Sequence, residues 1–140
     1  MSAQWPPELP VMRVRVARPT DRLDQVVAFY RDGIGLRVID SFQSHAGYSG
    51  VMLGLPGADY HLEFTQHEEG GPCLAPTRDN LLVFYLRDAA AIERVVARLG
   101  AMGHLSVPPE NPYWRDAGWV TIEDPDGWRV VFVPLATTTG

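Results

Sequence analysis

The alternation of hydrophobic and polar residues predicts the first secondary-structure elements of the chain. Residues 13–17 alternate polar and apolar side chains with a period of two, which is typical of a half-buried strand. In residues 23–30 the apolar positions recur at i, i+3, i+4 and i+7, which predicts the buried stripe of an amphipathic helix. Residues 19–21 read Pro-Thr-Asp and supply side chains suited to the start of that helix.

The second half of the chain repeats this pair of elements. Residues 81–86 form a short apolar run that predicts a strand, and Asp88 follows as the expected N-cap of a helix. Residues 92–99 carry the same helical stripe as the first half. Gly100 then lies where that helix is expected to end, because glycine accepts the backbone conformations of helix termini.

Two longer segments also repeat, each with an apolar run, a turn and a second apolar run. Residues 50–64 align with residues 118–132 without a gap at an offset of 68, so that Tyr60 matches Trp128. Apolar runs joined by Gly, Pro and Asp predict a β-hairpin in each half. Both halves therefore have the same order of elements, and such internal repeats point to a duplicated structural unit.

Short apolar segments after each helix, at 38–39 and 105–107, complete a β-α-β-β-β order in each half. The expected fold class is α+β, with two tandem βαβββ modules whose mixed sheets form a cup and whose helices cover the outer face. Module one is expected at 12–66 and module two at 80–134, with a polar linker at 67–79. The domain as a whole then spans 12–134, between a Pro-rich arm at 1–11 and a tail at 135–140.

Composition excludes several functional classes. The formal net charge is −5 with scattered acidic residues, which argues against nucleic acid as a partner. All 12 basic residues are arginine, so lysine Schiff-base chemistry and a Gly-Lys-Ser/Thr phosphate loop are excluded. The chain has no apolar run of about 20 residues and one cysteine, Cys73, so we expect a cytoplasmic protein without a membrane span or an internal disulfide.

The order of motifs resembles the vicinal-oxygen-chelate (VOC) superfamily, which includes glyoxalase I, bleomycin-resistance proteins, extradiol dioxygenases and fosfomycin-resistance enzymes. Paired βαβββ modules carry the resemblance, together with the sequence AFYRDGIGL at 28–36 and EDPDG at 123–127. It covers residues 12–134. The resemblance implies a small-molecule ligand in the cup and a homodimer, since members of the superfamily are often dimers.

Metal-dependent members of the superfamily offer a His or Glu from the first and last strand of each module. The matching positions here lie near Arg13, at Glu63, near Leu81 and at Val131. Glu63 alone can donate to a metal, because an arginine is a fixed cation and Leu and Val have no donor atoms. A catalytic metal normally has about three protein ligands. We therefore expect no metal and no cofactor.

Substitute metal ligands stay open at this point. His61 lies two residues before Glu63 and hence on the same strand face, so the two side chains could converge. His45, Asn80 and His104 lie in loops or near strand ends. With one of these three, His61 and Glu63 would reach the number of ligands that a metal needs.

Alternation assigns a lining to the cup. Leu62 and Phe64, Val130 and Phe132, and Val14 and Val16 are expected to face the helices. Their neighbours Arg13, Arg15, Ala17, His61, Glu63, Thr65, Arg129, Val131 and Val133 are then expected to face inward.

The candidate site combines these inward residues with groups from loops and from the strand at 81–86. Glu63 is the candidate catalytic residue, either as a general base or as a structural acid paired with Arg15. Trp114 or Trp119 could stack on an aromatic ligand, and Arg115 could bind its carboxylate. The candidate substrate-binding residues are Arg13, Arg15, His61, Tyr85, Trp114, Arg115 and Arg129.

Two functions from different classes follow. The first is a metal-free protein that binds a small organic molecule, aromatic or anionic, in the cup. The alternative is a lyase or isomerase of the glyoxalase I type that uses Glu63 as a base or as a ligand of a divalent metal. A third, weaker hypothesis is a regulatory or structural domain that binds a partner through the Pro-rich arm at 1–11.

Overall fold

The computed structural model describes residues 5–54, 58–116 and 118–135. The first four residues of the expected arm, Gly57 of the expected hairpin turn and the tail beyond residue 135 lie outside the described residues. The first module contains β1 (Val14–Pro19), α1 (Leu23–Ala28), the π-helical turn η1 (Phe29–Ile34), β2 (Arg37–His45), β3 (Tyr48–Gly54) and β4 (Tyr60–His67). The second contains β5 (Leu81–Leu86), α2 (Ala89–Ala101), the 3-10 turn η2 (Pro112–Arg115), β6 (Val120–Glu123) and β7 (Arg129–Pro134).

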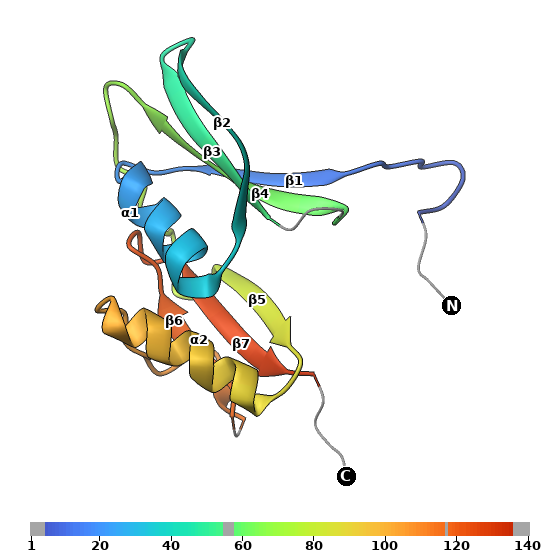
Figure 1. Cartoon of the computed structure of the whole chain (residues 1–140), viewed down its shortest axis with the longest axis vertical. Helices are drawn as coiled ribbons and strands as arrows, with labels where there is room; N and C mark the ends of the chain where they lie inside the picture. The colour runs from blue at the N-terminus through green and yellow to red at the C-terminus, as the bar shows by residue number, and fades with distance from the viewer. Residues whose placement is uncertain (1–4, 55–57, 117, 136–140) are drawn as a thin grey trace.

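The strands form two mixed sheets, one in each module. The first sheet has the order β1-β4-β3-β2 and the second has the order β5-β7-β6. In both sheets the first strand of the module runs parallel to the last, and the other pairs are antiparallel. The two-module α+β fold is therefore confirmed (Figure 1). Within the described residues no strand pairing joins the two sheets, so the cup is not one continuous hydrogen-bonded sheet.

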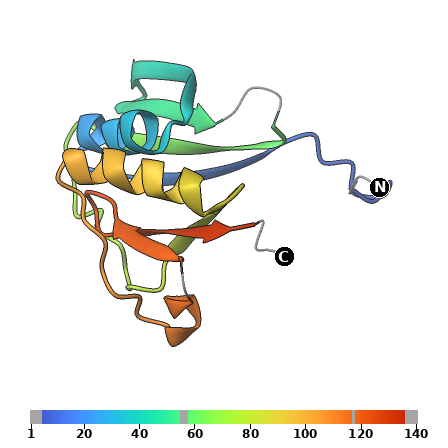
Figure 2. The ribbon, with the colours of Figure 1, turned by 60° about the horizontal axis from the view of Figure 1, so that its bottom comes forward.

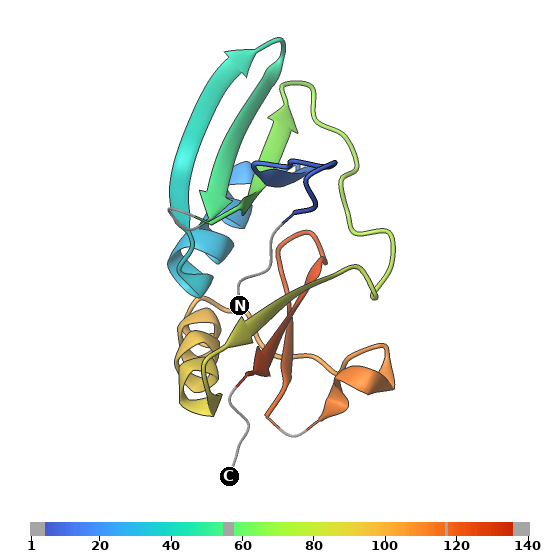
Figure 3. The same ribbon diagram turned by 90° about the vertical axis from the view of Figure 1, so that its right-hand side faces the viewer.

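The two helices lie side by side on one side of the molecule, each against the sheet of its own module (Figure 2). The linker between the modules runs along one flank from the end of β4 to β5 (Figure 3). The residues between Trp5 and β1 extend away from both modules (Figure 1). No helix in the described part of the chain has the length and apolar character needed to cross a membrane.

The helical stripes pack as the sequence predicts. Residues from α1, η1 and α2 meet the apolar faces of both sheets in one core, and Leu62, Phe64, Val130 and Phe132 are buried there as expected. Val16 lies opposite Leu62 and so shares the expected face, but its side chain is 53% exposed and the helices do not cover it. The helical part of the first module is short and lies over β4, so it does not reach across the edge strand β1.

The starts of the two helices differ. Asp88 caps α2 as predicted, accepting a hydrogen bond of 2.9 Å from the backbone N–H of Ala91. The capping residues expected at 19–21 do not cap α1, which begins at Leu23. The side-chain oxygen of Gln66 on β4 accepts the N–H of Leu23 instead, at 2.9 Å. A tertiary contact therefore replaces the local cap that the sequence suggested.

The strand predicted at 105–107 is reduced to a single bridge between Ser106 and Ile122. The N–H of Val107 still donates to the carbonyl of Thr121 at 2.9 Å. Two prolines follow at 108–109, and a proline has no N–H to continue a ladder. The second module therefore has a three-stranded sheet in the described residues, where the sequence predicted four.

The strand pairings also correct the gapless alignment of residues 50–64 with residues 118–132. In the first hairpin Leu53 lies opposite Leu62, and in the second Ile122 lies opposite Val130. The core positions of β3 and β6 therefore match at an offset of 69, whereas those of β4 and β7 match at 68. A gapless alignment would pair Leu53 with Thr121, on the wrong face, because a shift of one residue exchanges the faces of a strand.

A buried group of charged and aromatic side chains joins the two modules, and we call it the Arg18–Asp124 junction. Arg18 on β1 forms ion pairs with Asp124 and, at 3.0 Å, with Asp126. The hydroxyl of Tyr30 donates to Asp124 at 2.7 Å. The Arg18 guanidinium also lies 4.8 Å above the ring of Phe64. Since Asp124 and Asp126 belong to the EDPDG motif, this motif links the second module to the first.

The helices form the second contact between the modules. The guanidinium of Arg98 on α2 donates to the backbone carbonyls of Gly33 and Ile34 at 3.0 and 3.1 Å. Gly33 allows α2 to approach, because a Cβ atom there would lie 2.3 Å from a methyl carbon of Leu99. Gly35 ends the helical segment with a φ of 106°, a conformation that favours glycine. The sequence at 28–36 therefore serves the packing of the modules.

Candidate functional site

The structure brings Arg15, His61 and Glu63 together on the face of the first sheet that lies opposite α1. Arg15 and His61 are neighbours in the parallel pair β1–β4, and Glu63 follows on the same face of β4. The Nε of Arg15 donates to Nε2 of His61 at 3.0 Å, and one terminal nitrogen of Arg15 lies 3.7 Å from a carboxylate oxygen of Glu63. His61 and Glu63 are buried, whereas 47% of the Arg15 side chain is exposed.

The chemistry of this group is set by the protonation of His61. Burial lowers the pKa of His61, and the positive charges of Arg15 and Arg13 lower it further, while Glu63 acts in the opposite direction. The imidazole is therefore neutral at pH 7. Its Nε2 accepts a hydrogen bond from Arg15, so the proton of the ring is assigned to Nδ1. His61 and Glu63 together orient an arginine whose outer edge faces solvent.

The other candidate residues lie elsewhere. Arg13 precedes β1 on the same side and is exposed. Tyr85 on β5 is 61% exposed and lines an apolar groove of about 330 Å³ between β5 and the first module. Trp114 and Arg115 belong to η2, beside β6 in the second module (Figure 3). The ring of Trp114 packs against Trp119, with the centroids 5.9 Å apart.

Arg129 makes its ion pair and hydrogen bonds within the second module. Its guanidinium forms an ion pair with Glu123 at 3.0 Å and donates to the carbonyl of Pro108 at 2.9 Å, and the residue is 5% exposed. Val131 and Val133 on the same strand are also buried. Among the described residues, no hydrogen bond or ion pair connects Arg129 with Glu63. Arg129 is therefore not part of the hydrogen-bonded group of Arg15, His61 and Glu63.

The positions that the resemblance matches to metal ligands do not fit a metal here. The register places Ala17 opposite Glu63 and Val83 opposite Val131. Neither Ala17 nor Val83 has a donor atom. Within the described residues no group of three His, Cys, Asp or Glu side chains is close enough to hold a metal ion. His61, on the same strand face as Glu63, already accepts the Arg15 hydrogen bond.

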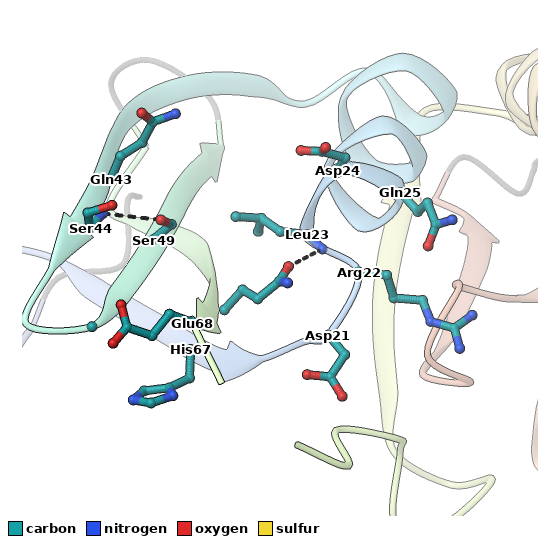
Figure 4. Close-up of a pocket in the computed structure, with 12 residues that line it drawn as sticks. Asp21, Arg22, Leu23, Asp24, Gln25, Gln43, Ser44, Ser49, His67 and Glu68 are labelled. Carbon is teal, nitrogen blue, oxygen red and sulfur yellow. Dashed lines mark hydrogen bonds between the residues drawn. The ribbon is translucent and has the colours of Figure 1, made fainter. Parts of the chain in front are cut away.

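A second, polar groove of about 550 Å³ lies between the start of α1, the β2–β3 hairpin and the end of β4 (Figure 4). Asp21, Asp24 and Glu68 give its lining an acidic character. The guanidinium of Arg22 is directed to the second module, 3.4 Å from the carbonyl of Pro125. A negatively charged lining does not suit an anion, so this groove is distinct in chemistry from the Arg15 face. The sequence repeat gave no signal for it, because its residues come from loops and strand ends.

Comparison of the chain with known proteins identifies its family. Residues 14–65 match the YycE-like N-terminal domain and residues 79–134 match the YycE-like C-terminal domain. Over 121 residues the chain is 52% identical to the uncharacterized protein YycE of Bacillus subtilis (strain 168), which covers 86% of each chain.

Solved structures extend the comparison. A crystal structure of a YycE protein of unknown function from Bacillus subtilis, with a proposed assignment as a glyoxalase/fosfomycin resistance protein, is 46% identical, covers 99% of both chains and has a TM-score of 0.87. The fosfomycin resistance protein FosX of Mesorhizobium loti shares the fold at 17% identity, with a TM-score of 0.66 and coverage of 88% of this chain and 90% of FosX. TnmS3, an antibiotic binding protein of a Streptomyces species, has a TM-score of 0.59 at 19% identity, with coverage of 87% and 93%.

The likeness to FosX and TnmS3 concerns the fold alone, whereas the match to YycE extends over sequence and structure. The chain belongs to the YycE-like family and has the fold of the VOC superfamily.

Proposed function

We propose that this protein binds a small organic anion at the face formed by Arg13, Arg15, His61 and Glu63, without a catalytic metal. The observation that carries the proposal is the state of Arg15. Its Nε and one terminal nitrogen are engaged by buried partners, while almost half of the side chain remains exposed. A guanidinium held in this way has little freedom left to lose when a ligand binds, and such preorganisation favours binding.

The charge balance supports an anion as the ligand. Arg13 and Arg15 bring two positive charges to this face, and Glu63 compensates one of them. His61 adds no charge, since burial and its arginine neighbours keep it neutral. The remaining positive charge attracts a carboxylate or a similar group, for which arginine supplies charge-assisted hydrogen bonds.

Replacing Arg15 with glutamine is expected to weaken the binding of benzoate by about tenfold to a hundredfold, the worth of a hydrogen bond to a charged group. Isothermal titration calorimetry with benzoate measures the effect, and benzyl alcohol serves as the uncharged probe that should bind poorly to both proteins. Arg94→Gln is the matched control, because Arg94 lies exposed on the outer helix α2. Equal affinities of the wild type and Arg15→Gln would contradict the proposal.

The alternative function is a lyase or isomerase of the glyoxalase type, with Glu63 as the base. Its support is a buried carboxylate within 3.7 Å of Arg15, at the edge of an open face. The two functions differ in what Glu63→Gln does. A binding protein keeps or increases its affinity for benzoate, because a negative charge is removed from the site. An enzyme that uses Glu63 as a base loses turnover in this variant while its affinity is retained.

The assembly belongs to the same proposal, as a cytoplasmic homodimer. Apolar side chains are exposed around β1, β4 and β5, with Val16, Tyr60 and Tyr85 each more than half exposed. β1 and β5 are also edge strands of their sheets, with one side free for pairing. Light scattering on the purified chain is expected to give twice the mass of 15.5 kDa. A mass of one chain at micromolar concentration would contradict this part of the proposal.

A further inference from the structure

Three residues of β3 share the face that carries Arg15, His61 and Glu63. The register of β3 and β4 places Gly54 opposite His61, Met52 opposite Glu63 and Gly50 opposite Thr65. Since side chains opposite each other in a sheet lie on the same face, Met52 projects there between two glycines. The glycines leave the surface of the sheet bare on either side of it.

Side chains of β2 cover these bare positions. A Cβ atom added to Gly50 would lie 2.6 Å from the ring of Phe42, and one added to Gly54 would lie 3.0 Å from the terminal methyl carbon of Ile39. The pairing of β2 with β3 is irregular between Val38 and Asp40, and a bulge of this kind can redirect a side chain. Ile39 and Phe42 therefore both lie over the backbone of β3, on the same face as the charged cluster.

These contacts create an apolar shelf, which we define as Ile39, Phe42 and Met52. Ile39 is 45% exposed, and Phe42 and Met52 are half-buried. The shelf lies on β2 and β3, whereas the exposed arginine lies on β1. Three strand spacings of about 4.8 Å separate the outer strands, so apolar and charged regions share one surface within about 14 Å.

We infer that the ligand of this face is an amphiphilic anion, with a carboxylate-like group on Arg15 and an apolar chain or ring on the shelf of Ile39, Phe42 and Met52. The inference rests on the proposed function and adds the ligand class and its specificity-determining residues. The two regions are complementary, because the shelf residues carry no charge and Arg15 supplies the positive charge. The absence of a side chain at Gly50 leaves room for the ring of Phe42.

The test is a series of straight-chain carboxylates, from propanoate through hexanoate to octanoate, titrated into the full-length protein and followed by calorimetry. Each added methylene is expected to increase the affinity by about twofold to fourfold, as for partial to complete burial of a CH₂ group. In Phe42→Ala and Met52→Ala this dependence on chain length is expected to flatten, with the affinity for propanoate unchanged. Leu74→Ala is the matched control, since Leu74 is 68% exposed in the linker.

Phe42→Leu is the control for a folding defect in Phe42→Ala. It keeps an apolar side chain and should retain most of the chain-length dependence. Circular dichroism compares the secondary structure of all variants. Hexanamide, which has the same chain without the charge, should bind at least about tenfold more weakly than hexanoate.

The outcomes separate the two proposals. Carboxylate binding that Arg15→Gln does not affect would overturn the proposed function, and the ligand class with it. Binding that depends on Arg15 but not on chain length would overturn the shelf alone. If Phe42→Ala leaves the chain-length dependence intact but converts a dimer into a monomer in light scattering, the shelf is covered by a second copy and the inference is wrong.

Discussion

Replacing Asp124 with alanine is expected to lower the free energy of unfolding by about 3 to 5 kcal/mol, the range found when one partner of a buried ion pair is removed. The Arg18 side chain is 11% exposed and would lose one of its two carboxylate partners, keeping Asp126, while Tyr30 would lose the acceptor of its hydroxyl. The backbone N–H groups of Asp126 and Trp128 would also lose an acceptor. Urea unfolding followed by tryptophan fluorescence measures the change.

The control for this experiment is Glu93→Ala, which removes a carboxylate from an exposed position of α2. A change of less than about 0.5 kcal/mol is expected there, as for most surface substitutions. If Asp124→Ala is as mild as this control, the junction does not join the modules in the way we describe.

Replacing Gly33 with alanine is expected to cost about 1 to 3 kcal/mol, the usual cost of overpacking a core. The new methyl group would lie 2.3 Å from a carbon of Leu99 and 3.4 Å from the sulfur of Met102, so α2 would have to move away from η1. Thermal and urea unfolding measure the loss. The double variant with Leu99→Ala is expected to cost less than the sum of the single variants, since the space is then available.

Gly100→Ala is the matched control, because it makes the same chemical change on the neighbouring helix. No heavy atom lies within 4 Å of a Cβ atom at this position, which lies inside α2. An alanine there is expected to raise the stability by about 0.4 to 1 kcal/mol by reducing the freedom of the unfolded chain. A loss of stability equal to that of Gly33→Ala would contradict a specific role for the approach of Leu99.

Asp124 and Gly33 explain what the motifs at 28–36 and 123–127 do in this chain. The sequence at 28–36 places Tyr30 under Asp124 and leaves Gly33 free of a side chain, and EDPDG supplies the carboxylates on the other side. Both motifs therefore identify the fold through the contact between the modules. They give no information on the ligand, because their contacts join the two modules.

The sequence predicted most of the fold because local patterns determine most of its elements. The strand at 81–86 and the helix capped by Asp88 lie where the sequence predicts them. Two of the errors involve elements distant in sequence, and one is local. Gln66 caps α1 from another strand, the two prolines after Val107 end a ladder that apolar pattern alone would extend, and Val16 lies beyond the reach of a short helix.

For the candidate site, alternation along one strand was sufficient to bring His61 and Glu63 to one face, and the neighbouring strand added Arg15. Loop residues such as Trp114 could not be placed in this way, because no periodicity fixes where a loop folds. The apolar shelf was missed because a bulge in β2 determines the direction of Ile39. The signal available in the sequence was the pair of glycines at 50 and 54 on either side of Met52, at the even spacing of one strand face.

The parallel pairs of the two modules are not in the same register. Paired residues of β1 and β4, such as Arg15 and His61, are 46 positions apart in the sequence. Paired residues of β5 and β7, such as Val83 and Val131, are 48 positions apart. The two additional residues displace one first strand along its neighbour by about 7 Å relative to the other. The duplicated halves are therefore unequal along this direction, and a symmetrical molecule could not contact both of them in the same manner.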